Sequence, residues 1–345
     1  MKNGKEGEKK MKVAINGFGR IGRLVLRAFF EAAVKKRYNF EIVAINDLVN
    51  IDTAIHLFRH DSVHGRFFGD IQKKSDTEML INGQSIAYLS KRTPSELPWN
   101  DLGIDLVLEC TGIFKKKDDC KAHLLAGAKK VIISCPADDA DNTIVFGVNS
   151  NALNKNTDII ISNASCTTNC LAPVVKAIHE TIGIVSGFVT TVHAYTGDQK
   201  LVDMGHKDER RCRSAALSMI PTSTGATKAI EKIFPELRGK LGGFSVRVPT
   251  PNVSMINFTC SLKKTATSED VNNTIKSYSD GSLNGILGYT EESLVSCDFN
   301  HDSHSAVADL QLTKVIDGTI AHIVAWYDNE WGFANRMLDV SAIMF

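Results

Sequence analysis

The sequence lacks the charge imbalance and the terminal signals that would assign it to a specialised class. Forty lysine and arginine residues face thirty-nine aspartate and glutamate residues, so the formal charge is only +1. An excess of basic charge is what draws a whole chain to nucleic acid or to a membrane, so we expect neither partner. Lysine and glutamate alternate at the N-terminus with no apolar run before the first strand, so we expect no signal peptide and no membrane-spanning segment.

Paired or clustered cysteines are also missing. The chain has eight cysteines with no CxxC pair and no Cys/His cluster, so we expect no structural zinc and no other metal site. Irregular spacing without an export signal predicts reduced thiols and a cytoplasmic protein. The cysteines are Cys110, Cys120, Cys135, Cys166, Cys170, Cys212, Cys260 and Cys297.

What is present predicts an α/β protein of two domains, because 345 residues exceed what one hydrophobic core usually organises. We expect residues 1–10 to be a disordered extension. From residue 12 to about 165, short runs that are apolar throughout alternate with helical stretches. Runs without polar alternation are typical of parallel strands buried on both faces, which predicts a doubly wound, Rossmann-type domain over 11–165.

After residue 165 the strands lengthen, and apolar and polar residues alternate along them. This pattern favours a largely antiparallel sheet covered by helices, an α+β domain over 166–330. Helical stretches are expected near 225–238 and 268–279. The last segment, 331–345, is predicted to be a helix that packs back on the first domain.

A glycine-rich turn opens the first domain. Gly17, Gly19 and Gly22 form GxGxxG between a strand and a helix, the context in which this motif indicates a dinucleotide site. Gly17 makes the tight turn, Gly19 lets the backbone approach the pyrophosphate, and Gly22 lets helix and strand pack closely. The helix N-terminus offers unpaired N–H groups to the phosphates.

Asp47 follows the second strand, at the distance expected for a carboxylate that accepts hydrogen bonds from the adenosine ribose hydroxyls. A 2′-phosphate would meet like charge there, so NAD is predicted over NADP. An isolated aspartate at a strand end more often begins an ordinary turn. The strand, the glycines and the spacing together favour the cofactor interpretation.

Cys166 is the candidate nucleophile, because it lies between a strand and a helical stretch. A helix N-terminus stabilises thiolate over thiol. Pro173 leaves the start of that helix open, and a single cysteine is often only a small apolar residue. His193, on a strand of the second domain, is the candidate acid/base partner, held as imidazolium by the thiolate.

With these residues in place, the chain resembles the glyceraldehyde-3-phosphate dehydrogenases from residue 11 to 345. The segments that carry the resemblance are INGFGRIGR, SNASCTTN, HAYTGDQ, PTSTGATKA, RVPTPNVS and WYDNEWG. The resemblance implies a homotetramer and a phosphorylating, NAD-dependent reaction. Cys166 would form a thiohemiacetal and then a thioester with glyceraldehyde 3-phosphate, His193 would take the hydroxyl proton, and inorganic phosphate would release 1,3-bisphosphoglycerate.

The resemblance also implies two anion sites. Thr196 and Arg247 would bind the substrate phosphate. The residues that would bind the inorganic phosphate are Ser165, Thr167, Thr224 and Gly225, with Arg211 close by. The cofactor residues it implies are Gly17, Gly19, Arg20, Ile21, Gly22, Asp47, Arg92, Ser134 and Asn329. Arg20 and Ile21 would lie at the pyrophosphate, and Asn329 at the carboxamide.

Three alternatives stay open. An erythrose-4-phosphate dehydrogenase would share the nucleophile and the C-terminal segment, although HAYTGDQ and PTSTGATKA favour a seated phosphate. A binding or signalling protein could keep the fold without catalysis, which the retained Cys166 and His193 argue against. Cys170, one helical turn from Cys166, either pairs with it under oxidation or is a buried helix-face residue.

Overall fold

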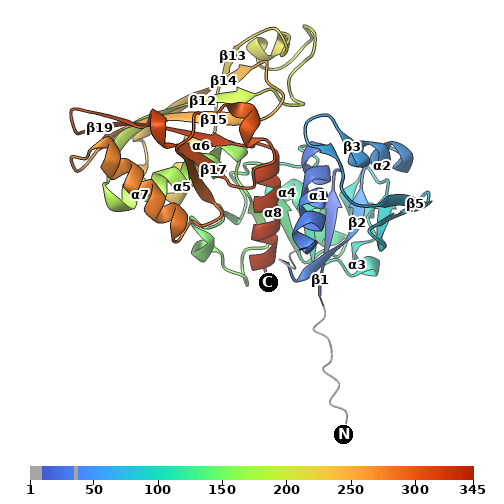
Figure 1. The fold of residues 1–345 in the computed structure, drawn as a ribbon. Coiled ribbons are helices and arrows are strands. Elements are labelled where there is room, and N and C mark those ends of the chain that lie inside the picture. The colour runs from blue at the N-terminus through green and yellow to red at the C-terminus, as the bar shows by residue number, and fades with distance from the viewer. Residues whose placement is uncertain (1–9, 35–37) are drawn as a thin grey trace.

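The structure, a computed structural model, describes residues 10–34 and 38–345. Its elements form two lobes built around separate sheets, with the C-terminal helix between them (Figure 1). Of the extension predicted over 1–10, only Lys10 lies within the described residues, where its Nζ is 3.2 Å from Glu41 Oε1. The rest of that prediction falls outside them.

The first sheet has nine strands within the described residues, in the order β10-β11-β9-β8-β1-β2-β7-β6-β5. From β10 to β7 the neighbours run parallel, and β6 and β5 add an antiparallel edge. The strands are β1 (Met11–Asn16), β2 (Phe40–Asn46), β5 (Ile71–Ser75), β6 (Glu78–Ile81), β7 (Gln84–Leu89), β8 (Leu106–Glu109), β9 (Lys130–Ile133), β10 (Asn142–Thr143) and β11 (Ile160–Ser162). This confirms the predicted Rossmann-type architecture.

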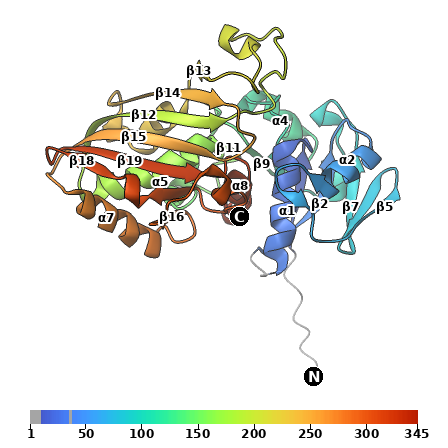
Figure 2. The same ribbon diagram turned by 45° about the horizontal axis from the view of Figure 1, so that its top comes forward.

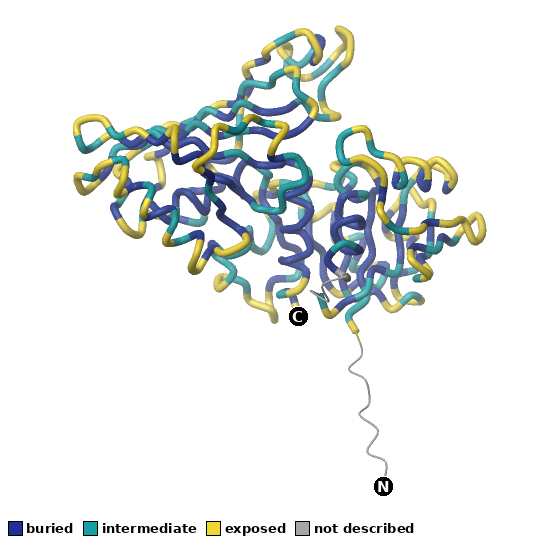
Figure 3. Tube along the Cα trace, in the orientation of Figure 1, coloured by how far each residue is buried: buried dark blue, intermediate teal, exposed yellow. Residues whose placement is uncertain are grey.

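Helices cover this sheet because its central strands are apolar on both faces. All four residues of β8 and of β9 are buried, which leaves no face for water. The helices are α1 (Arg20–Val34), α2 (Ile51–Arg59), α3 (Trp99–Leu102) and α4 (Lys117–Leu125), and a small hairpin pairs β3 (His60–Asp61) with β4 (Gly65–Arg66). Figure 3 shows the buried strands inside this layer of helices.

The second sheet has eight strands among the described residues, seven of them in the order β13-β14-β12-β15-β19-β17-β16, with β18 beside β19. Most neighbours are antiparallel, as predicted, but β12 pairs with β14 and β16 with β17 in parallel. The strands are β12 (Ile184–Ala194), β13 (Ile220–Thr222), β14 (Leu241–Val248), β15 (Ser254–Leu262), β16 (Leu287–Thr290), β17 (Ala306–Asp309), β18 (Lys314–Ile316) and β19 (Ile320–Tyr327).

Helices α5 (Cys166–Thr181), α6 (Ala226–Ile233) and α7 (Ser268–Asp280) share one apolar cluster with this sheet. Figure 2 shows the strands of the sheet side by side, with α5 and α7 against it. Helix α8 (Trp331–Ile343) instead lies against α1, and its Phe333, Met337 and Leu338 belong to the core of the first sheet.

The antiparallel edge formed by residues 71–89 is not anticipated by the sequence analysis. Strand β5 has the sequence IQKKS and buries only Ile71. An exposed edge strand needs few apolar residues, so it leaves no apolar run to detect. Pro173 likewise gives a misleading signal, since α5 continues through it to Thr181.

A cluster of charged and aromatic side chains joins the two lobes. Arg20, at the start of α1, forms ion pairs with Asp61 and with Glu330 of the second lobe. His64 Nε2 lies 3.1 Å from Glu330 Oε2, and His64 Nδ1 lies 3.1 Å from His301 Nδ1. One of those two Nδ1 atoms must donate and the other accept, so both rings cannot be protonated while the contact holds.

We expect Asp61→Asn to weaken this junction and its response to acid. Burial raises the pKa of Asp61, but backbone N–H groups of His64 and Val63 and the charge of Arg20 outweigh it, so the pKa lies below its ordinary value. Such a carboxylate stabilises the fold above the unfolded-state pKa of about 4, and the stabilisation is lost as the pH falls further. Urea unfolding of wild type and variant at a series of pH values measures this.

The variant should lose about 1 kcal/mol at pH 7, a figure discounted because Arg20 is partly exposed. Its free energy of unfolding should fall less steeply than that of wild type between about pH 5 and pH 3. If the free energy of unfolding fell equally steeply with pH in the two proteins, Asp61 would not contribute this pH-dependent stability.

Candidate active site

The glycine-rich turn has the geometry that its sequence predicts. Gly17 has a φ of +92°, and a Cβ there would lie 2.5 Å from the backbone nitrogen of Thr111, so no other residue fits. At Gly22 a Cβ would overlap the carbonyl oxygen of Gly17. A Cβ on Gly19 would meet nothing within 4 Å, so that backbone faces open space at the start of α1.

A cavity of about 330 Å³ lies over this turn, at the carboxyl ends of β1, β2 and β8. It brings together Gly17, Gly19, Asp47 and Arg92 from the predicted cofactor residues. Asp47 accepts hydrogen bonds from Phe18 N at 2.5 Å and from Val49 N at 2.9 Å, so its carboxylate is held at the rim of the turn. Open backbone beside an anchored carboxylate fits a dinucleotide.

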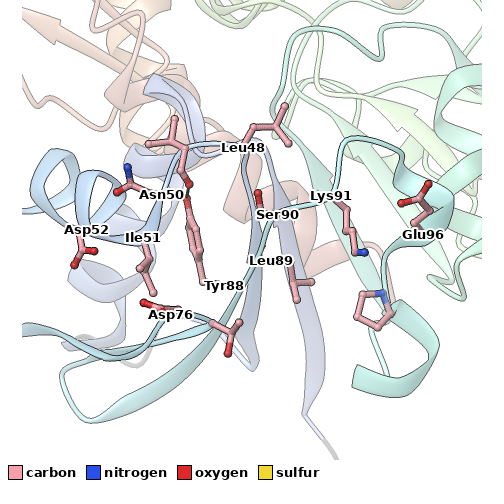
Figure 4. A pocket seen from close by; sticks show the side chains of 13 residues that line it. Leu48, Asn50, Ile51, Asp52, Asp76, Tyr88, Leu89, Ser90, Lys91 and Glu96 are labelled. Atoms are coloured by element: carbon pink, nitrogen blue, oxygen red, sulfur yellow. Dashed lines mark hydrogen bonds between the residues drawn. The ribbon is translucent and has the colours of Figure 1, made fainter.

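A second cavity, of about 630 Å³, adjoins the first and shares Leu48 and Lys91 with it. Figure 4 shows Tyr88 and Ile51 on its apolar side, and Asp52, Asp76 and Glu96 around it. It lies beyond Asp47 on the β2 side of the sheet, so it extends the first cavity past that carboxylate.

The remaining predicted cofactor residues lie on α1, just after β9 and just before α8. Ile21 is the second residue of α1, and Ser134 follows β9, where its N–H bonds the carbonyl of Glu109 at 3.0 Å. The Arg20 side chain faces Asp61 and Glu330 rather than the glycine turn, which leaves its backbone N–H for a phosphate. Asn329 is buried, and its Oδ1 accepts from Ser254 Oγ at 2.8 Å.

Cys166 is the first residue of α5. Ser165 caps the helix by accepting from Thr168 N at 3.0 Å. Just before the cap, Ala164 has a φ of +57°, a left-handed conformation that non-glycine residues rarely adopt. Strain of this kind is typical of functional sites, and here it turns the chain sharply between β11 and α5.

His193, on β12, faces this thiol, with its Nε2 3.4 Å from Cys166 Sγ. On the other side of the ring, Nδ1 lies 2.7 Å from the carbonyl oxygen of Ala194. Arg247 Nη1, which can only donate, also lies 3.1 Å from Nδ1, so the two contacts favour opposite tautomers. The shorter contact is to the carbonyl, which only accepts, and it favours a proton on Nδ1 with Nε2 as the acceptor for the thiol.

The pKa shifts at the pair run against the thiolate–imidazolium pair that the sequence predicts. Burial raises the pKa of the Cys166 thiol, although Arg247 and the N–H groups at the start of α5 pull it down. Burial and the charge of Arg247 lower the pKa of His193 to about 3. Both directions favour a neutral thiol facing a neutral imidazole, because burial disfavours each charged form.

Arg247, on β14, lies beside the pair. Its terminal Nη1 is 3.1 Å from His193 Nδ1, 3.2 Å from Ala194 O and 3.4 Å from Thr196 Oγ1. Its Nε is buried and has no hydrogen-bond partner among the described residues. A buried cation with an unused donor fits an anionic ligand, and Thr196 supplies a hydroxyl at the same place.

The other predicted phosphate residues are less tightly grouped. Arg211 donates from Nη1 to Asp198 Oδ2 at 2.7 Å and from Nε to Thr222 Oγ1 at 3.0 Å. Thr224 accepts from Ala226 N at 3.2 Å, and Gly225 caps α6. Within the described part of the chain, neither Thr224 nor Gly225 hydrogen-bonds to Cys166, His193 or Arg247.

Two residues of the site escaped the sequence analysis. Tyr327 Oη lies 3.0 Å from Thr167 Oγ1 and 2.9 Å from Thr191 Oγ1, under the catalytic pair. Glu109, at the end of β8, is a buried carboxylate behind the cofactor cavity. The only sequence signals were a glutamate and a tyrosine at the carboxyl ends of mostly apolar strands.

The fold and this site define a class: a two-domain, dinucleotide-dependent dehydrogenase with a cysteine nucleophile. Comparison with known proteins narrows it. Residues 11–117 match the NAD-binding domain of glyceraldehyde 3-phosphate dehydrogenase, and residues 165–329 match its C-terminal domain. The chain therefore belongs to the glyceraldehyde-3-phosphate dehydrogenase family, and its cofactor is NAD.

Curated relatives match along nearly the whole chain. The plasmid-encoded glyceraldehyde-3-phosphate dehydrogenase of Cupriavidus necator is 55% identical over 335 residues, covering 97% of this chain and 98% of that protein. The Xanthobacter flavus enzyme is 53% identical over 334 residues, with the same coverage. That of Geobacillus stearothermophilus is 49% identical over 332 residues, covering 96% and 97%.

Two further features of the described residues bear on other classes of function. Across residues 10–34 and 38–345, no three histidine, cysteine, aspartate or glutamate side chains group as metal ligands would. None of the helices described is long and apolar enough to cross a membrane.

His193 should make the fold sensitive to mild acid. Its pKa of about 3 lies well below that of an unfolded histidine, so below pH 6.5 the unfolded chain binds a proton that the folded chain does not. Stability therefore falls as the pH falls. Between pH 7 and pH 5 the loss from this group is about 2 kcal/mol, and His193→Gln should not show it.

Urea unfolding at the two pH values measures this difference. His56→Gln, which removes an exposed histidine on α2, is the matched control and should keep the wild-type pH dependence. If His193→Gln also kept it, His193 would be protonated in the folded protein, as the ion-pair prediction requires.

Proposed function

We propose that this chain oxidises D-glyceraldehyde 3-phosphate with NAD and inorganic phosphate to 1,3-bisphosphoglycerate and NADH, through Cys166 and His193. The observation that carries the proposal is the 3.4 Å contact between Cys166 Sγ and the acceptor nitrogen of His193, beside an NAD-binding domain. The relatives described above bear the name of this activity. The reaction is one of glycolysis and gluconeogenesis.

The residues of the pair divide the chemistry between them. Nε2 of His193 takes the thiol proton as Sγ bonds to the aldehyde carbon and returns it to the carbonyl oxygen, which gives a thiohemiacetal on Cys166. The same nitrogen then takes the hydroxyl proton as the carbon loses hydride, which leaves a thioester. NAD would supply the hydride acceptor. Attack by phosphate on the thioester forms the acyl phosphate, and the departing Cys166 sulfur takes back the proton held by Nε2.

Arg247 links substrate binding to this proton transfer. We assign it, with Thr196, to the phosphate of the aldehyde, because its buried Nε lacks a partner among the described residues and its Nη1 already touches Thr196. A bound phosphate would offset the charge that disfavours the His193 imidazolium. The pKa of His193 would then rise toward the range in which a base works best.

The attacking phosphate is assigned to hydroxyls and N–H groups at two helix starts. Ser165 and Thr167 begin α5, while Thr224 and Gly225 begin α6. Helix N-termini present unpaired N–H groups and partial positive charge, which suits an oxyanion. Arg211, whose guanidinium lies on Asp198, adds the nearby fixed charge.

For the cofactor, we assign the backbone of Gly17, Gly19, Arg20, Ile21 and Gly22 to the pyrophosphate. Asp47 takes the adenosine ribose, which favours NAD over NADP. Arg92 and Ser134 flank the adenosine and nicotinamide sides, and Asn329 fixes the rotation of the carboxamide.

We further propose that the protein is a cytoplasmic homotetramer. Its domains would span 11–165 and 166–330, and segment 331–345 would pack back on the first domain. Exposed apolar side chains support assembly from copies of this chain. Phe188 and Phe244 pair on the uncovered face of the second sheet, and Leu201, Leu217 and Met219 lie exposed on the long segment between β12 and α6.

The first test is NADH formation from glyceraldehyde 3-phosphate with and without inorganic phosphate, with erythrose 4-phosphate as the parallel substrate. We expect phosphate-dependent turnover of the triose and none in Cys166→Ser. His193→Asn should lower kcat about 10²- to 10⁴-fold. Preference for the tetrose without phosphate dependence would make the protein an erythrose-4-phosphate dehydrogenase instead.

Arg247→Leu tests the assigned phosphate site. It should lower kcat/KM for glyceraldehyde 3-phosphate about 10- to 100-fold, the worth of a hydrogen bond to a charged group. Unphosphorylated D-glyceraldehyde is the matched control, because it has no phosphate to lose. An equal loss with both aldehydes would assign Arg247 to the catalytic pair alone.

A further inference from the structure

A buried carboxylate lies behind the cofactor cavity without touching it. Glu109 ends β8 and is 1% exposed. Its Oε2 accepts from Asn16 Nδ2 at 2.6 Å and from His123 Nε2 at 3.1 Å. Its Oε1 accepts from Thr111 N at 2.8 Å and from the Thr111 hydroxyl. Asn16 and Thr111 both line the cavity, so the carboxylate holds two of its walls.

The histidine that faces this carboxylate does not neutralise it. Trp99 Nε1 donates to His123 Nδ1 at 3.1 Å. An indole N–H can only donate, so Nδ1 is unprotonated and the proton sits on Nε2, toward Glu109. If the ring carried a second proton, Nδ1 would become a donor and would face the donor N–H of Trp99. The two carboxylate oxygens of Glu109 accept from four donors, and no lysine or arginine among the described residues lies within ion-pair distance, so no cationic side chain compensates this carboxylate.

The sheet places this charge at one particular end of the cofactor. Strands β9, β8, β1 and β2 are consecutive neighbours in the first sheet. Asp47 follows β2 and is assigned to the adenosine ribose, while the glycine turn follows β1 and is assigned to the pyrophosphate. The nicotinamide half must then lie over the ends of β8 and β9, where Glu109 is. An atom resting on Thr111 or Asn16 would be about 6 Å from the carboxylate, two hydrogen-bond lengths.

We propose that Glu109 is a positioning residue whose buried charge makes the site favour NAD⁺ over NADH. The nicotinamide ring is positive in NAD⁺ and neutral in NADH, whereas the pyrophosphate is the same in both. A fixed negative charge near the ring therefore stabilises the oxidised form selectively, and its repulsion of the pyrophosphate cancels in the ratio of the two affinities. This inference rests on the proposed cofactor assignment, with adenosine at Asp47.

The test is isothermal titration calorimetry of the whole protein with NAD⁺ and with NADH. Glu109→Gln keeps the shape and the acceptor oxygen but removes the charge. We expect the ratio of the NADH to the NAD⁺ dissociation constant to fall roughly three- to tenfold. Glu109→Asp, which keeps the charge, should preserve more of the ratio. His123→Gln, which keeps a donor toward Glu109, is the matched neutral control and should leave the ratio unchanged.

A second variant keeps the test informative if Glu109→Gln does not fold, because it offsets the negative charge of Glu109 without replacing Glu109. His123→Lys sets a cation against the carboxylate and should shift the ratio in the same direction. If affinities for both forms change equally in whichever charge variant folds, Glu109 is only structural and the proposal is wrong. If wild type binds neither form, the cofactor assignment itself fails, which is a separate result.

Discussion

The proposed chemistry depends on one contact, between the thiol of Cys166 and Nε2 of His193, and that contact depends on two cores at once. Cys166 follows the last strand of the first sheet and packs against the apolar clusters of both lobes. His193 belongs to β12, held between β14 and β15. Neither lobe alone can set the distance between the two atoms. The left-handed Ala164 is what lets the chain leave one sheet and begin α5 at that point.

Around this contact, charge is placed where the reaction changes charge. Burial and Arg247 lower the pKa of His193, which must become cationic in the proposed reaction, so an anion bound at Arg247 would make the histidine more basic. On the cofactor side, the inferred role of Glu109 opposes the loss of positive charge from the nicotinamide. In this proposal the substrate activates the catalytic pair, whereas a thiolate–imidazolium pair, as predicted from the sequence, would be preformed.

Motif residues were predictable because their roles are local. A turn with φ of +92° and no room for a Cβ admits only glycine, so GxGxxG in a strand–helix context predicts its own geometry. The start of α5 was left open because of Pro173, and the structure places it at Cys166, after the capping Ser165. The charge state of the pair did not follow, because burial and Arg247 come from elements distant in sequence. Glu109 and Tyr327 were missed for the same reason: each matters only through side chains that the fold brings to it.

The role of Cys170 was left open by the sequence. The structure places Cys170 on α5, fully buried in the apolar cluster of the second lobe, where burial raises the pKa of its thiol well above the usual value.

The ion pairs of Arg20 show how the two ends of the cofactor site are held at a fixed separation. Arg20 begins α1, whose N-terminus is assigned to the pyrophosphate, and its side chain is bound to Glu330. Glu330 directly follows Asn329, the residue assigned to the carboxamide, and precedes α8, which lies against α1. A guanidinium used in this way cannot also serve the phosphates, which is why the backbone must do so. With these assignments the side chain would fix the spacing between pyrophosphate and carboxamide, and that spacing would determine where the nicotinamide lies relative to Cys166.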